Sequence, residues 1–215
     1  MEINSIGMPA RLARKRDMVV AAIMGLFFGA LAIPILINFE IKQAWLLILM
    51  APISAGVFAM TLFVTYLATS SISSLYQFAK FSLVGALNST VDFGALNSLI
   101  LATGIVSGVR FIGIKSASAT LAVINSYFWN KYWTFEGVTS GGSMMEFVAF
   151  LVVSLVGIGF NIVGAHIVVN VIGPPSQFPP KLWANIGALS AAVLTMFSNF
   201  LGYKFFVFRT PEQNH

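Results

Sequence analysis

Residues 78–101 read FAKFSLVGALNSTVDFGALNSLIL, an apolar run that is interrupted by amides and by one carboxylate. Asp92 lies well inside this run, and Asn88 precedes it by about one helical turn. An ionised group is expensive in bilayer hydrocarbon, so a carboxylate at this depth indicates a functional site. The stretch therefore predicts a membrane helix that does more than anchor the chain.

The rest of the chain has the same apolar character. Of its 215 residues, 58% are hydrophobic and 9% are charged, and the mean hydropathy is +0.88. A soluble domain cannot bury so much apolar surface, so the composition predicts an integral membrane protein. The chain has no cysteine, which excludes thiol chemistry. The net charge of +5 comes mostly from basic residues at span ends, which favours a topology signal or anionic-lipid contact over nucleic-acid binding.

Six apolar stretches are each long enough for a membrane helix of about 20 residues. They cover residues 18–39, 43–69, 76–103, 111–135, 145–172 and 182–208. The first stretch is longer than the core of a signal peptide, and a second span follows at once, so we expect it to be retained. The predicted fold class is an all-α integral membrane protein with six transmembrane helices.

The distribution of basic residues predicts the orientation. Eight of the 12 Lys and Arg residues lie on one side if the N-terminus is inside. The positive-inside rule then places both termini in the cytoplasm, in a multi-pass protein of the cytoplasmic (inner) membrane. The first side holds Arg11, Arg14, Lys15, Arg16, Lys80, Lys131, Lys204 and Arg209, and the other holds Lys42, Arg110, Lys115 and Lys181.

The last four spans contain an internal repeat. Residues 78–81 (FAKF) align with residues 147–150 (FVAF), and residues 131–135 (KYWTF) align with residues 204–208 (KFFVF). One unit is a two-helix hairpin, so the repeats, at about 76–136 and 145–209, run parallel. Parallel repeats occur in transporters, whose substrate sites lie at the repeat interface. Duplication of a purely structural hairpin is the alternative, because symmetry of a fold does not establish function.

The first two spans lie outside the repeat. Gly25 and Gly29 give the first span a face of small residues, and Ala51, Ala55 and Ala59 do the same for the second. Such faces let helix backbones approach closely. We therefore expect residues 1–70 to form a basic segment and a hairpin for packing or partner docking, apart from the site, and residues 71–215 to form a four-helix domain.

Each span of the repeat carries a polar stripe at helical spacing. Facing lipid would leave these groups unpaired, so we expect a four-helix bundle with the stripes turned inward. Asp92 lies roughly 18 Å from Lys80 along the helix, near the middle of a ~30 Å hydrocarbon core. The stripes are formed by Asn88 and Asp92, by Ser118, Asn125 and Trp129, by Ser154 and Asn161, and by Asn185 and Asn199.

Structural roles compete with functional ones at these positions. Intramembrane amides can serve as interhelical contacts worth about 0.6 kcal/mol each. Asp92 can be a protonated carboxyl bonded to Asn88 or to an amide on another helix, or else a ligand for hydroxyl-rich or cationic cargo. Lys131 and Lys204 can extend to the interface beside aromatic residues, or hold a phosphate.

Several motifs that resemble known sites do not fit. Residues 108–116 (GVRFIGIKS) lack the Gly-Lys pair of a phosphate loop, and residues 157–159 (GIG) lack the third glycine of a dinucleotide turn. The sequence offers no metal-ligand spacing and no cofactor motif. Its loops are too short for a catalytic domain, so we expect a protein that is not an enzyme acting alone.

Residues 76–209 resemble the GtrA-like family of small four-helix membrane proteins. The resemblance rests on residues 78–85 (FAKFSLVG) with Asn88 and Asp92, on residues 125–135 (NSYFWNKYWTF), and on residues 199–208 (NFLGYKFFVF). The second copy departs from the pattern, because Tyr203 stands opposite Asn130 and Phe206 stands opposite Trp133. The N-terminal hairpin also lies outside the usual pattern.

The resemblance implies translocation, or flipping, of a polyprenyl-phosphate-linked monosaccharide across the membrane for modification of surface glycans. The partners are then that lipid, the membrane and, in some relatives, a polyprenyl-phosphate glycosyltransferase. Sugar hydroxyls need amides and carboxylates, and the phosphate needs cations near headgroup level. The substrate-binding residues predicted in this way are Asn88, Asp92, Asn125, Asn130, Lys131, Trp133, Asn161, Asn199 and Lys204.

Two other functions stay open. The chain can be a subunit that anchors or regulates a glycosyltransferase, in which case substitutions at Asp92 and Lys131 should be tolerated. It can also be a small proton-coupled cation exporter that uses Asp92. A homodimer with a contact at Gly25 and Gly29 is a further hypothesis.

Overall fold

The computed structural model describes residues 10–68, 73–105, 108–135, 144–176 and 180–208. These residues form helices and turns with no strand among them, which confirms the all-α prediction for this part of the chain. The helices are α1 (Ala10–Asn38), α2 (Ala44–Ala68), α3 (Ser73–Thr103), α4 (Gly108–Trp129), the π-helical turn η1 (Asn130–Thr134), α5 (Met144–His166), η2 (Ile167–Ile172), α6 (Pro180–Gly202) and η3 (Tyr203–Val207).

Three of these helices have the length and apolar composition needed to cross a membrane: Lys15–Asn38, Ala44–Ala68 and Met144–Gly164. They agree with a multi-pass membrane protein. Helix α3 is long enough to span but carries Lys80, Asn88 and Asp92 within its length, and each such residue lowers its hydropathy. The arrangement with six spans stays a prediction.

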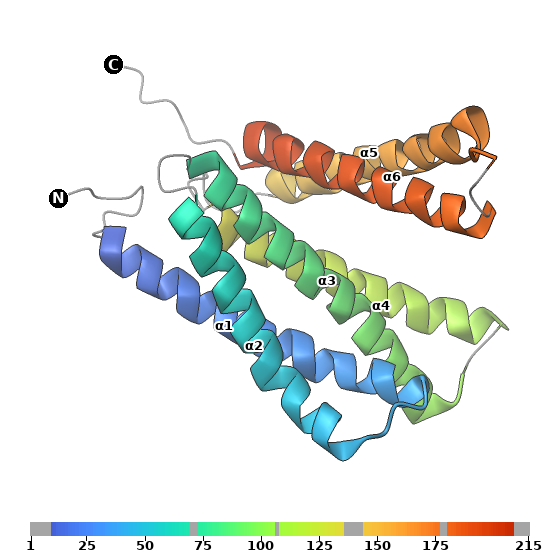
Figure 1. Ribbon diagram of the computed structural model, residues 1–215, viewed down its shortest axis with the longest axis horizontal. Helices are drawn as coiled ribbons and strands as arrows, with labels where there is room; N and C mark the ends of the chain where they lie inside the picture. The colour runs from blue at the N-terminus through green and yellow to red at the C-terminus, as the bar shows by residue number, and fades with distance from the viewer. Residues whose placement is uncertain (1–9, 69–72, 106–107, 136–143, 177–179, 209–215) are drawn as a thin grey trace. The chain divides into compact units, whose positions relative to one another are not determined.

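The chain forms two compact units, residues 1–136 and residues 137–215. In the first unit, α1 packs against both α2 and α3, and α4 pairs with α3. Figure 1 shows that the starts of α1 and α3 and the end of α4 lie at the same end of this unit. In the second unit, α5 pairs with α6. The N-terminal hairpin is thus packed onto the first copy of the repeat, while a domain boundary near residue 70 stays a prediction.

The small-residue faces of α1 and α2 meet each other, as their sequence predicts. A Cβ atom on Gly25 would lie within 3 Å of backbone atoms of Ser54 and Ala55, and one on Gly29 within 3 Å of backbone atoms of Ala51. Helix α2 therefore covers this face inside the chain. The proposed homodimer contact at Gly25 and Gly29 is wrong for that reason, although the contact predicted between helix backbones is correct.

An apolar core joins α1, α2 and α3 at the end where η1 lies. It is built from fully or almost fully buried side chains of α1, α2, α3 and η1. Helices α1 and α2 are therefore part of the same packing unit as the hairpin α3–α4. Its members are Ala21, Met24, Phe58, Leu62, Leu83, Val84, Leu87 and Trp133.

The two predicted repeats end in the same irregular structure. Helix α4 passes into the π-helical turn η1, which the Phe135 amide closes by donating to the Asn130 carbonyl at 2.9 Å. Helix α6 passes into η3, where the Phe208 amide donates to the Tyr203 carbonyl at 2.8 Å. Short π-helical turns are uncommon, and they often lie at functional sites.

Matching aromatic contacts brace the two π-helical turns. The Phe81 and Phe135 rings lie 6.4 Å apart, and the Phe150 and Phe208 rings lie 6.5 Å apart. These residues correspond to one another in the sequence alignment of the repeats. The likeness supports the predicted duplication. The four-helix bundle would combine hairpins from both units, and it stays a prediction.

Candidate functional site

Asp92 is held by an ion pair between α3 and α4. Lys115 Nζ lies 2.6 and 2.8 Å from the two carboxylate oxygens, and the Ser118 hydroxyl donates to Oδ1 at 2.7 Å. The Asp92 and Lys115 side chains are 23% and 40% exposed in the chain. The sequence predicted Asn88 or another amide as the structural partner, and it assigned Lys115 to the topology signal at the span end. Both assignments need correction. Lys115 is itself the partner of Asp92, and it lies about two turns inside α4.

A chain of amides lies one turn from this ion pair. The Trp129 indole Nε1 donates to Asn125 Oδ1 at 3.0 Å, and Asn125 Nδ2 approaches Asn88 Oδ1 at 3.5 Å. The second distance is at the long limit for a hydrogen bond, so that contact is weak. The stripes predicted on these two helices do face each other. Side-chain amides that are bonded so loosely retain donors and acceptors for hydroxyl groups.

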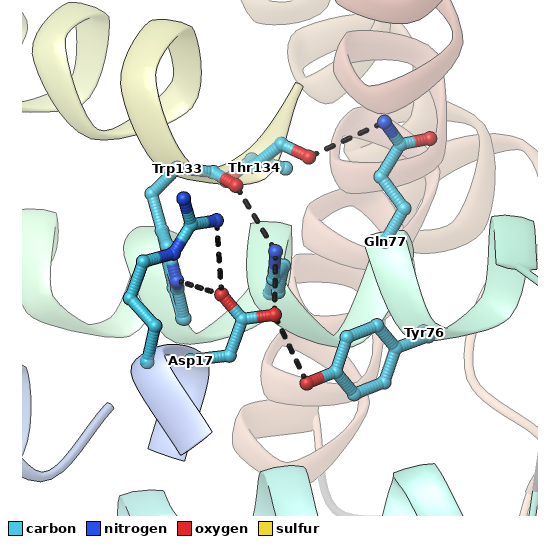
Figure 2. A network of polar contacts seen from close by, with 7 residues as sticks. Asp17, Tyr76, Gln77, Trp133 and Thr134 are labelled. Atoms are coloured by element: carbon cyan, nitrogen blue, oxygen red, sulfur yellow. Dashed lines mark hydrogen bonds and ion pairs between the residues drawn. The ribbon is translucent and has the colours of Figure 1, made fainter. Parts of the chain in front are cut away.

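A third polar group lies at the end of the hairpin, and we call Asp17, Tyr76, Lys80 and Trp133 the Asp17 cluster (Figure 2). Lys80 Nζ lies 2.9 Å from Asp17 Oδ2, and the Trp133 indole Nε1 donates to Oδ1 at 3.0 Å. The Tyr76 hydroxyl donates to Oδ2 at 3.2 Å, and Arg16 approaches Oδ1 at 3.5 Å. The Asp17 and Lys80 side chains are only 5% and 3% exposed.

Side chains of α3 also satisfy the carbonyl groups at the end of η1. Lys80 Nζ donates to the Trp133 carbonyl, and Gln77 Nε2 donates to the Thr134 carbonyl, each at 3.2 Å (Figure 2). The last carbonyls of a helix have no partner within it and carry partial negative charge. An ammonium group and an amide are therefore well suited to this position, and they fix η1 against the start of α3.

Asn130 and Lys131 are buried within η1. Asn130 Nδ2 donates to the Ser126 carbonyl at 2.9 Å. Its Oδ1 is buried and has no hydrogen-bond partner among the described residues, and the same holds for Thr134 Oγ1. Lys131 Nζ lies 3.3 Å from the Tyr127 hydroxyl and over the Tyr127 and Tyr132 rings at 5.5 and 5.6 Å. Cation–π contacts stabilise a lysine that is removed from water.

In the second unit, the predicted polar residues are arranged differently. Asn161 is half-buried and makes no side-chain hydrogen bond to another described residue. The Asn199 amide packs against Gly157, where an added Cβ atom would collide with it. Asn199 Oδ1 is buried without a hydrogen-bond partner in the described part of the chain. The side chain of Asn185 lies outside the described residues.

The end of the second hairpin has aromatic contacts where the first has polar ones. The Tyr203 hydroxyl lies 2.6 Å from Ser154 Oγ, and its ring stacks on Phe150 with centroids 4.7 Å apart. Lys204 Nζ lies over the Phe200 and Phe205 rings at 5.7 and 5.8 Å. Lys131 and Lys204 thus share an aromatic environment, as their equivalence in the repeat predicts.

Sequence reasoning missed Asp17 and the role of Lys80. The N-terminal hairpin was expected to lie apart from the site, but the structure brings its Asp17 to the predicted site residue Trp133. One signal was available, since Asp17 is the acidic residue that ends a basic run just before an apolar span. Its partner is not visible in the sequence because Lys80 is 63 residues away.

The hairpin α3–α4 therefore carries polar contacts at three successive levels. They run from the Asp17 cluster, past Asn88 and Asn125, to Asp92 and Lys115. Such a track offers donors, acceptors and charges to a polar group inside a membrane. No cluster of His, Cys, Asp and Glu suited to a metal ion occurs among the described residues.

Comparison with known proteins identifies the family. A model of the GtrA/DPMS transmembrane domain matches residues 80–208. The "Uncharacterized membrane protein YngA" of Bacillus subtilis (strain 168) is 30% identical over 135 residues, which are 63% of this chain and 81% of that protein. No solved structure matches the chain. Since the matched region covers more than half of the chain and most of both predicted repeats, this multi-pass membrane protein belongs to the GtrA/DPMS transmembrane domain family.

Proposed function

We propose that this protein translocates a polyprenyl-phosphate-linked monosaccharide across the cytoplasmic membrane, and that it does so without catalysing a chemical reaction. The observation that carries the proposal is the track of polar contacts along α3 and α4. A sugar headgroup must exchange its water hydrogen bonds for protein ones while it crosses hydrocarbon. The prenyl tail can stay in lipid, so such a track does not need a wide aqueous channel.

The residues of the track have complementary proposed roles. Asp92, Asn88 and Asn125 exchange hydrogen bonds with sugar hydroxyls at the middle of the membrane. In this role the sugar replaces the Ser118 hydroxyl on Asp92, while Lys115 keeps the carboxylate charge compensated. A compensated carboxylate is far less costly at this depth than an isolated one.

The phosphate is proposed to bind at a hairpin end, and each unit offers one such end. Lys131 and Lys204 are the cations there, and each lies among aromatic rings. Asn130 and Trp133 are proposed to complete the binding residues of the first unit, and Asn161 and Asn199 those of the second. Asn130 and Asn199 each hold a buried carbonyl oxygen with no partner among the described residues, and such an oxygen can accept a hydrogen bond from a sugar hydroxyl.

The contacts of Asp92 also bear on the alternatives. A cation exporter needs a carboxylate that is open to its cargo, but Asp92 already has an ammonium partner at 2.6 Å. The exporter therefore has less support than the translocase. A subunit that anchors a glycosyltransferase does not need an ion pair and amides at three levels of one hairpin, although it would fit the same family.

The test is transbilayer movement of a fluorescent polyprenyl-phosphate hexose in proteoliposomes that contain the purified protein. We compare wild type, Asp92→Asn, the double variant Asp92→Asn/Lys115→Gln, and the control Glu40→Gln. Glu40 is an exposed carboxylate in the turn between α1 and α2, where it pairs with Lys42. The double variant removes the ion pair without leaving either charge unpaired.

We expect movement with wild type and with Glu40→Gln, and none with either Asp92 variant. Recovery in the double variant would mean that Asp92 only balances Lys115, which contradicts its proposed contact with the sugar. Absence of movement with folded wild type would overturn the translocase and favour the anchoring subunit. Accessibility of tags at the two termini from each side of the membrane tests the proposed cytoplasmic location of both ends.

A further inference from the structure

The Asp17 cluster has the chemistry of an anion-binding site that is already filled. An ammonium, an indole N–H and a phenol hydroxyl converge on one carboxylate, at 2.9, 3.0 and 3.2 Å (Figure 2). All three groups are donors that phosphate oxygens accept readily, and the charge on the lysine strengthens its contact. The same three donors would satisfy the oxygens of a phosphate.

The donors and the acceptor come from different parts of the chain. Lys80 and Trp133 lie within residues 80–208, which match the family model, and Tyr76 lies on the same helix as Lys80. Asp17 belongs to α1, which precedes the matched region. The matched region thus supplies the cation and the indole donor, Tyr76 precedes that region on α3, and the added hairpin supplies the anion.

Burial explains why a resident anion is needed. The Lys80 side chain is 3% exposed, and a buried cation without a partner is strongly destabilising. If a phosphate binds Lys80 only part of the time, another anion must compensate the charge of the lysine while no phosphate is bound. Asp17 does so, and its helix begins only about two turns earlier, at Ala10.

The second hairpin lacks the cluster altogether. In the repeat alignment, Ala149 stands opposite Lys80, Met145 opposite Tyr76 and Phe206 opposite Trp133. Met145 and Phe206 are 74% and 75% exposed within the chain. The two copies therefore share the lysines Lys131 and Lys204 but differ in the donor set. An anion site of this kind is formed by the first copy, among the residues that the structure describes.

The start of α1 is also suited to attract anions. Arg11, Arg14, Lys15 and Arg16 directly precede Asp17. A basic run beside a membrane helix attracts anionic headgroups. A lipid phosphate that this basic run attracts can compete with Asp17 for its donors.

We propose that Lys80, Trp133 and Tyr76 form a binding site for the phosphate of a lipid, and that the Asp17 carboxylate occupies this site as an exchangeable counter-ion when no lipid is bound. The inference deepens the proposed function, on which the choice of a lipid phosphate rests, by adding Lys80 to Lys131 and Lys204 as a cation that contacts the phosphate. Asp17 leaves the donors when the phosphate binds, and the first turns of α1 loosen from α3.

The test is equilibrium binding of a radiolabelled ten-carbon prenyl monophosphate to the purified full chain in neutral detergent. The matching prenol and inorganic phosphate serve as separate ligands, so that tail and phosphate contributions can be distinguished. The variants are Asp17→Asn, the double variant Asp17→Asn/Lys80→Gln, and the control Glu40→Gln. Glu40→Gln removes the same charge from an exposed turn of the same hairpin. Circular dichroism and size-exclusion chromatography check the fold of each variant.

We expect Asp17→Asn to lower the Kd for prenyl monophosphate about tenfold, because it removes a competitor that occupies the site most of the time. The double variant should bind more than about tenfold more weakly than Asp17→Asn, because it lacks the charged donor. Since both variants lack the ion pair with α1, their difference isolates Lys80. Prenol should not distinguish the variants, and inorganic phosphate should bind much more weakly than the prenyl ester.

Equal or weaker binding by Asp17→Asn than by wild type would overturn the proposal and leave Asp17 a structural residue. A free-phosphate site is indicated instead if inorganic phosphate binds as tightly as the ester. A second measurement needs no variant. Hydrogen exchange at residues 10–17 should become faster when prenyl monophosphate is added to wild type. Unchanged or slower hydrogen exchange contradicts the proposed release of Asp17 by the phosphate.

This test is separable from that of the proposed function. If binding behaves as expected but wild type moves no lipid in proteoliposomes, translocation is wrong and the anion site stands. If wild type moves lipid but the Asp17 variants bind as wild type does, the anion site is wrong and translocation stands.

Discussion

At the scale of single residues, compensation of charge is the dominant feature of this protein. Two carboxylates of the first unit, Asp17 and Asp92, each have a lysine partner within 3 Å. Each lysine comes from another helix, so each pair also ties two helices together. Removing one member of such a pair costs more than removing both, because the remaining charge loses its partner.

Asp92→Asn should therefore destabilise the protein more than Asp92→Asn/Lys115→Gln does. We expect a difference of about 1–2 kcal/mol, below the 3–5 kcal/mol typical of fully buried pairs, because both side chains are partly exposed. Denaturant titration in detergent micelles measures it. Equal stability of the two variants would mean that Lys115 is solvated by water or lipid headgroups when Asp92 is absent.

At the scale of secondary-structure elements, small residues decide how closely helices approach. The hairpin α1–α2 is joined backbone to backbone at Gly25 and Gly29, whereas α5 and α6 are joined where Gly157 makes room for the Asn199 amide. The first contact is between rigid backbones, and the second involves a side chain that can rotate. The same substitution should therefore have different consequences in the two hairpins.

Gly25→Ala should destabilise the protein by about 1–3 kcal/mol, because the added methyl group meets backbone atoms of α2 and the helices must move apart. Gly56→Ala is the matched control. A Cβ atom there meets nothing within 4 Å, so stability should stay the same or rise slightly with helix propensity. The midpoint of thermal unfolding in detergent compares them. Equal shifts in both variants contradict the close contact of α1 with α2.

Gly157→Ala should reduce transport more than it reduces stability. The added methyl group displaces the Asn199 amide, which is proposed to contact the substrate, but that side chain can adopt another rotamer. Gly159→Ala, two residues along α5, meets open space and serves as the control. Proteoliposome transport and thermal unfolding are measured for both. Unchanged transport by folded Gly157→Ala would contradict the proposed contact of Asn199 with the substrate.

At the scale of the whole molecule, the chain divides into two compact units, each of which holds one copy of the sequence repeat. The family model matches residues 80–208, yet the core of the first unit takes Ala21, Met24, Phe58 and Leu62 from outside that range. The N-terminal hairpin is thus a structural part of the unit. It also supplies the carboxylate that compensates Lys80.

Deletion of residues 1–72 should therefore destabilise the remaining domain strongly. The loss removes the buried ion pair of Asp17 with Lys80, worth about 3–5 kcal/mol, and exposes the core face of α3. Thermal unfolding is measured for the full chain, the truncated chain and Asp17→Asn. The loss of stability in Asp17→Asn gives the contribution of the ion pair, and the further loss in the truncated chain gives that of packing. A truncated chain with the same midpoint as wild type would contradict an integral role for the hairpin.

Local sequence patterns predicted several features of this protein correctly. Hydropathy and length indicated helices whose ends agree closely with α3, with α5 together with η2, and with α6 together with η3, because burial in lipid depends on runs of apolar residues. Small residues at helical spacing predicted the contact of α1 with α2, because two backbones can meet only where side chains are absent. The helix period also placed Asn88 and Asn125 on facing stripes.

Only the tertiary structure decided which charges meet. Asp17 and Lys80 are far apart in the sequence, and Asp92 and Lys115 lie on different helices, so neither pairing is fixed by a local period. Helical spacing determines the face on which a residue lies, but not the helix that covers that face or the height at which two helices align. The sequence by itself determined a helical membrane protein with polar stripes. Packing of α1 and α4 onto α3 determined which residues compensate one another's charge.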